Sequence, residues 1–219
     1  MVTRPQSSFE QGLEDLQADI VSLAALIPEA LAAAVQSLLD GDRVLAQAVC
    51  DGHAGLASAV ARNESHAYEL MVRHQPAAGD LRLLMTVIRM GREIERSSKL
   101  VRHVAEFALW RMTSVLTPRV RGLIERMGDE ARRLFLGAID AYVDRDLSRA
   151  EALDIWDDRL DQLHREFLAE LFTNPPPLPT LIELVLVGRY IERVADHAVI
   201  IGERVHYLVT GEIPAVRAR

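Results

Sequence analysis

Apolar residues recur three and four positions apart through most of this chain, and this spacing limits the folds open to it. The pattern is plainest near the N-terminus, where it comprises Phe9, Leu13, Leu16, Ile20, Leu23 and Ile27. Spacings of three and four place side chains on one face of an α-helix, whereas a strand requires alternation. Because later segments repeat the pattern, the chain is predicted to be all-α.

Turn and breaker residues divide the pattern into six long helices. They cluster at residues 40–42, 74–80, 117–118, 144–146 and 174–179. Asp42 is expected to cap the second helix, and Thr117 to open the fourth with Pro118 in its first turn. Gly211 is expected to end the sixth helix. Pro28 is expected to kink or loosen the first helix.

The long helices come in two sets of three, which indicates an internal repeat of roughly a hundred residues. Short connections make consecutive helices antiparallel neighbours, so each repeat is predicted to be a three-helix bundle. We place the first repeat at residues 1–114 and the second at 115–219. Trp110 and Trp156 are expected to anchor the bundles. The buried stripe of the third helix is predicted to comprise Leu84, Ile88, Gly91, Ile94, Ser98, Val101, Ala105 and Ala108.

Composition argues against several classes of protein. The 219 residues are 49% hydrophobic but only 5% aromatic, so the core should consist of Leu, Ala, Val and Ile. A formal charge of −7 argues against a nucleic-acid-binding protein, which normally carries a basic face. The single cysteine rules out an internal disulfide and fits a reducing compartment. No signal peptide is visible, and no apolar run approaches the roughly 20 residues that span a bilayer. We therefore expect a soluble, cytoplasmic protein.

Two pairs of carboxylates stand out in the second half of the chain. Asp157 and Asp161 lie on the fifth helix, and Glu192 and Asp196 lie on the sixth. Side chains four residues apart on a helix lie about 6 Å from each other on one face. Each acid follows a residue of its helix's apolar stripe by one position, so both pairs should point toward the same side of the bundle. The two helices are antiparallel, and counting outward along both from the proline-rich connection places Asp161 opposite Glu192. The pairs are therefore predicted to form one patch of four carboxylates.

Four carboxylates suit hard cations, so this patch is predicted to bind Mg²⁺, Mn²⁺, Ca²⁺ or iron, with Zn²⁺ less favoured. His164 lies one turn beyond Asp161 and could add a nitrogen ligand. The alternative is a solvated acidic surface in which Arg159 and Arg193 serve as ion-pair partners.

The first repeat departs from this pattern. Glu95 occupies the position of Glu192, but Lys99 replaces the second acid. Counting outward along the second and third helices from the connection near residue 76 places Ala57 opposite Glu95 and His53 opposite Lys99. A lysine beside a divalent ion is unfavourable, so this half is predicted to hold no metal, with Lys99 as the countercharge of Glu95. The alternative is an ordinary solvated face.

Three motifs resemble those of the PhoU family, and together they span most of the chain. Residues 192–198, followed by Thr210-Gly211, resemble the C-terminal signature of that family. Residues 157–161 resemble the other half of its acidic motif, and residues 75–82 its inter-helix signature in the first repeat.

The resemblance implies a non-enzymatic, cytoplasmic regulator of phosphate uptake that binds iron or another metal through its carboxylates. It also implies contacts with the ATPase of a phosphate ABC transporter and with the sensor histidine kinase that represses the phosphate-starvation response. Association with membrane complexes would then be peripheral, and formation of a homodimer stays open.

Two other functions were weighed against this one. A carboxylate-bridged di-iron enzyme needs paired Glu-x-x-His motifs, and Glu203 with His206 has that spacing. However, Glu203 lies about 10 Å along the helix from Asp196, so the two sets cannot close on one metal pair. The other function is a metal-free adaptor whose acidic patch docks a basic partner. The sequence contains no Walker loop, no dinucleotide glycine motif and no paired nucleophile and base, so no enzyme is predicted.

Overall fold

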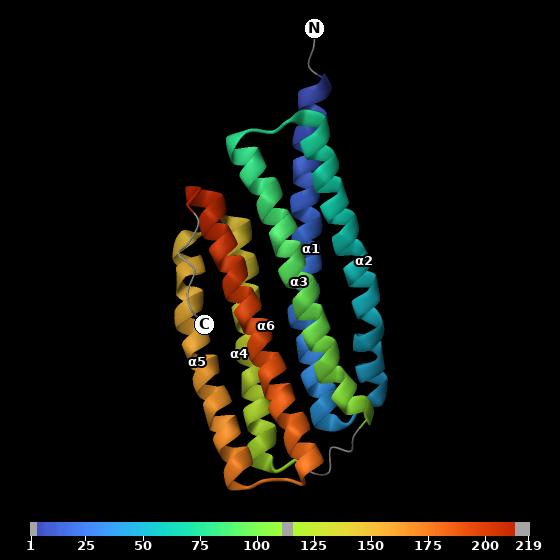
Figure 1. Ribbon diagram of the computed structural model, residues 1–219, viewed down its shortest axis with the longest axis vertical. Coiled ribbons are helices and arrows are strands. Elements are labelled where there is room, and N and C mark those ends of the chain that lie inside the picture. The colour runs from blue at the N-terminus through green and yellow to red at the C-terminus, as the bar shows by residue number, and fades with distance from the viewer. Residues whose placement is uncertain (1–3, 111–115, 213–219) are drawn as a thin grey trace.

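The computed structural model describes residues 4–110 and 116–212. Six helices account for nearly all of these residues, and all of them run along one long axis (Figure 1). They are α1 (Arg4–Asp40), α2 (Arg43–His74), α3 (Ala78–Trp110), α4 (Pro118–Asp144), α5 (Leu147–Thr173) and α6 (Leu178–Thr210). The described residues contain no strand, so the all-α prediction is confirmed.

The helix ends follow the predicted capping residues. The Asp42 carboxylate accepts two backbone N–H groups at 3.0 Å, and the Thr117 hydroxyl accepts the N–H of Val120 at 3.2 Å. Gly211 follows α6 with a φ of 79°, in the left-handed region that glycine adopts without strain. Arg145 takes the same role after α4 with a φ of 52°, although it carries a Cβ.

Pro28 lies within the first helix and does not end it. α1 continues through it for 37 residues. The neighbouring turns are fully buried at Ala24, Ile27 and Leu31. Packing on both sides of the proline therefore holds the helix together where one backbone hydrogen bond is missing.

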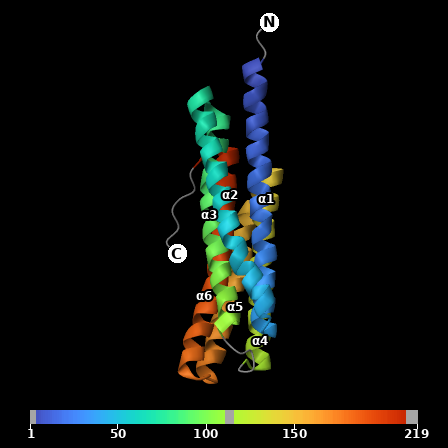
Figure 2. The ribbon, with the colours of Figure 1, turned by 90° about the vertical axis from the view of Figure 1, so that its right-hand side faces the viewer.

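The helices form two three-helix units that lie against each other. Helices α1, α2 and α3 pack together, as do α4, α5 and α6, and the two units meet where α3 contacts α6 and α1 contacts α4 (Figures 1 and 2). One continuous apolar cluster runs through all six helices. The two-bundle architecture is thus confirmed, whereas the predicted boundary at 114/115 lies outside the described residues.

The predicted stripe of α3 is buried at all eight positions. Gly91 lies in this stripe where a Cβ would come within 3.1 Å of Val60 on α2 and 3.8 Å of Ile20 on α1, so a small residue suits the position. The expectation for Trp110 was wrong, because its side chain is 82% exposed at the end of α3. Trp156 is partly buried and packs against the core, as expected.

Two helices are long and apolar enough to cross a membrane, judged by length and composition alone. They cover Ser8–Asp40 and Arg43–His74. The sequence expectation that no apolar run comes near that length was therefore too strict. Core helices of soluble bundles pass the same test, and one face of each of these helices packs against the other helices. The observation is weak support for a membrane span.

Candidate functional site

Glycines allow α6 to lie close to α5, the two helices that carry the acidic pairs. A Cβ on Gly188 of α6 would lie 2.7 Å from the ring of Phe167 and 3.3 Å from that of His164. A Cβ on Gly202 would lie 2.7 Å from Leu153. Real Cβ atoms do not approach this closely, so the helix spacing depends on the absence of side chains at these positions.

Three of the predicted carboxylates, those of Asp157, Asp161 and Asp196, act electrostatically on the fourth, Glu192. Glu192 is buried, whereas Asp157, Asp161 and Asp196 are half-buried. Burial, and then the charge of Asp196, raises the pKa of Glu192 to about 7 against the opposing charge of Arg189. Asp161 and Asp157 also raise this pKa, which shows that the α5 acids act on the α6 acid. We call these four residues the acidic cluster.

Arg189 supplies the nearest positive charge to the acidic cluster. Its guanidinium donates to both carboxylate oxygens of Glu192 from one turn earlier on α6. The sequence had suggested Arg159 and Arg193 for this role. Arg159 instead pairs with Glu130 of α4 at 2.8 Å, and Arg193 faces the opposite side of α6. Neither expected arginine is therefore the partner of Glu192, because sequence spacing alone did not show which arginine shares a face with it.

The chemistry of this site fits a hard cation, although the side chains are not yet arranged around one. Among the described residues, no group of three or more His, Cys, Asp or Glu side chains is placed to hold a metal ion. The Nε2 atom of His164 is buried without a hydrogen-bond partner. Burial and the charge of Arg189 lower the pKa of His164, against the effect of Asp161, which favours the neutral imidazole that a metal requires.

The corresponding face of the first repeat carries few acidic groups. Glu95 and Lys99 are both exposed, and within the described part of the chain they form no ion pair with each other. His53 shares a 2.8 Å hydrogen bond with Ser98, and burial lowers its pKa. Ala57 offers no ligand atom. The expected pairing of Lys99 with Glu95 is therefore not formed.

Sequence reasoning missed a buried pair that joins the two repeats. Nδ1 of His197 on α6 lies 2.6 Å from Oε2 of Glu93 on α3, and these residues are 4% and 7% exposed. Arg96 lies 3.7 Å from the other oxygen of Glu93. The sequence did offer one signal, because Glu93 lies beside the apolar stripe of α3 and a charged side chain is seldom buried without a partner.

These features define a class of protein: an all-α protein of two three-helix repeats with an acidic cluster in the second. Comparison with known proteins leads to the family. The PhoU domain matches residues 20–108 and 124–205. The chain belongs to the PhoU family.

Named relatives match nearly the whole chain. A protein of Mycobacterium leprae described as "Phosphate-specific transport system accessory protein PhoU homolog 1" is 32% identical over 212 residues, 95% of this chain and 96% of that protein. A relative from Caulobacter vibrioides is 27% identical over 97% of this chain and 94% of its own length. The crystal structure of PhoU from Pseudomonas aeruginosa is 27% identical, covers 93% of this chain and 100% of its own, and superposes with a TM-score of 0.86.

Proposed function

We propose that this PhoU-family regulator acts on a phosphate-specific transport system by binding its partners rather than by catalysis. The partners would be the ATPase of the transporter and a sensor histidine kinase, which the protein would meet at the cytoplasmic side of the membrane. The names and extent of its relatives support the link to phosphate transport. The rigid helical scaffold and its charged faces support a role in docking.

We further propose that the acidic cluster is a metal centre. The observation that carries this proposal is the buried carboxylate of Glu192, whose pKa is raised to about 7 among three other acids. Arg189 neutralises this group only in part, and Asp157, Asp161, Glu192 and Asp196 together would hold iron, Mg²⁺, Mn²⁺ or Zn²⁺. A bound divalent cation would supply charge neutralisation that a single arginine gives incompletely.

Arg189 links this centre to the surface. It would have to release Glu192 before the four carboxylates could act as ligands, because it occupies both oxygens of that group. Its side chain is already 49% exposed, so release would turn it outward into solvent. The α5–α6 face would then present a free guanidinium and a neutralised acidic cluster, a change in charge that a docked partner would detect.

Metal content tests the centre directly. We expect Asp161→Ala and Glu192→Gln to lose the metal that the wild type retains after dialysis, measured by elemental analysis. Asp158→Asn is the matched control, because it removes an exposed acid of α5 next to the acidic cluster. Retention of metal by both site variants would contradict the centre. If Asp161→Ala kept its metal content but bound the partner more weakly, the metal-free adaptor would be the better description.

The regulatory role is tested in cells. Deletion of the gene is expected to release alkaline phosphatase synthesis during phosphate excess, and the wild-type gene should restore repression. Unchanged repression in the deletion strain would refute the regulator, whatever the metal content of the protein.

A further inference from the structure

A second, basic site lies where the two repeats meet. A surface hollow of about 330 Å³ opens between α3 and α6. Its polar lining comprises Arg96, Lys99, His103, Tyr190, Arg193 and His197, and no described residue lends it a carboxylate. We call it the basic hollow. It faces α3, whereas the acidic cluster faces α5, so the two sites are separate.

The cations of the basic hollow are incompletely neutralised. Among the described residues, Lys99 and Arg193 form no ion pair, and Arg96 has only a 3.7 Å contact with Glu93. The histidines differ, because His103 and His197 each have a glutamate within 2.8 Å. Three side chains of like charge from two helices therefore converge where an anion could lie between them.

We propose that the basic hollow binds a phosphate group. A compact anion of two charges can be shared by Lys99 on one helix and Arg193 on the other, whereas a carboxylate offers half the charge and fewer acceptors. The guanidinium groups supply directional donors that match phosphate oxygens, and the tyrosine hydroxyl adds another donor. This assigns a role to Lys99, the residue by which the first repeat departs from its acidic motif.

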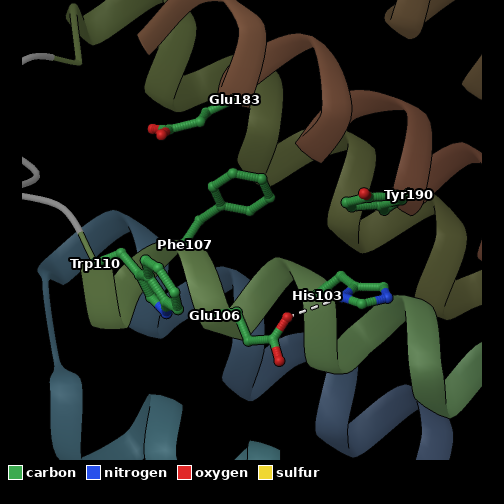
Figure 3. A pocket seen from close by; sticks show the side chains of 6 residues that line it. All are labelled: His103, Glu106, Phe107, Trp110, Glu183 and Tyr190. Carbon is green, nitrogen blue, oxygen red and sulfur yellow. Dashed lines mark hydrogen bonds and ion pairs between the residues drawn. The ribbon is translucent and has the colours of Figure 1, made fainter. Parts of the chain in front are cut away.

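The neighbouring surface indicates which phosphate compounds could bind. A pocket of about 220 Å³ shares His103 and Tyr190 with the basic hollow and is otherwise lined by Phe107, Trp110, Glu106 and Glu183 (Figure 3). It offers aromatic surfaces, with carboxylates that would repel a second phosphate. An aromatic phosphate monoester could therefore place its phosphate in the basic hollow and its ring beside Phe107, whose own ring lies 6.4 Å from that of Tyr190.

Calorimetry on the full chain tests the proposal, with a metal chelator present so that phosphate cannot bind through an ion. Inorganic phosphate is expected to bind the wild type. Lys99→Ala and Arg193→Ala should each weaken binding about tenfold, and the double variant should abolish it. Arg62→Ala with Arg119→Ala is the matched control, because both arginines are exposed and lie outside the hollow.

Adenosine monophosphate forms the second arm of the experiment. Tighter binding than inorganic phosphate, lost on Phe107→Leu, would support a monoester as the ligand, and equal or weaker binding would support free phosphate. Absence of binding of both compounds at millimolar concentration would overturn the proposal. Binding that the double variant retains would also overturn it. Because the metal and deletion experiments use other residues and readouts, failure here would leave the proposed function standing.

Discussion

Replacement of Gly188 by alanine would test whether close contact of α5 and α6 sets the geometry of the acidic cluster. The new Cβ would lie 2.7 and 2.9 Å from two ring carbons of Phe167, which is fully buried and cannot turn into solvent. Overpacking of this kind costs about 1–3 kcal/mol, and the better helix propensity of alanine returns up to about 1 kcal/mol. We expect Gly188→Ala to lower the free energy of unfolding by about 1–2 kcal/mol.

Urea denaturation followed by circular dichroism measures this change. Gly122→Ala in α4 is the control, because a Cβ there meets nothing within 4 Å and should stabilise the protein by roughly 0.5–1 kcal/mol. Affinity for a divalent cation should fall in Gly188→Ala and stay unchanged in the control. If the two variants were equally stable, the close approach of α6 to α5 would not constrain the protein, and the reasoning would be wrong.

Three further predictions concern the ionisation of Glu192, the buried pair of Glu93 and His197, and the backbone conformation of Arg145. The pKa of Glu192 in the folded protein is raised to about 7, so its contribution to stability is full below pH 4.5 and is lost as pH rises through 7. With a chelator present, Glu192→Gln should remove about 1–2 kcal/mol of this loss, measured by denaturation at pH 5 and pH 8. This value is smaller than the full pKa difference would give, because solvent screens the group. Glu93→Ala should lower stability by about 1–3 kcal/mol because it leaves a buried imidazole unpaired, and adding His197→Leu should recover part of it in a double-mutant cycle. Arg145→Gly should raise the melting temperature, since glycine suits a φ of 52° at a gain of about 0.5–1 kcal/mol, and a lower value would contradict this.

The helices and their ends could be predicted because their signals are local. Asp42 needs only the N–H groups that follow it, and Gly211 needs only its own backbone freedom. That Asp161 acts electrostatically on Glu192 agrees with reflection of the antiparallel helices α5 and α6 about their short connection. These inferences required no knowledge of which helices meet across the repeats.

Contacts between distant segments were not accessible in the same way. Glu93 and His197 are 104 residues apart, and only the packing of α3 on α6 brings them together. The choice of Arg189 over Arg193 as the partner of Glu192 depends on side-chain direction, which the order of residues leaves undetermined. Trp110 was expected to anchor the bundle, but it follows the last buried turn of α3 and is exposed.

Helix α6 takes part in both sites. Glu192 and Arg193 are consecutive residues, yet one faces α5 and the other faces the groove beside α3. Any translation or rotation of α6 would therefore alter the acidic cluster and the basic hollow together. If α6 moved on binding, a cation in the acidic cluster and an anion in the basic hollow would change each other's affinity by the same factor. The protein could then respond to both ions through the position of this one helix.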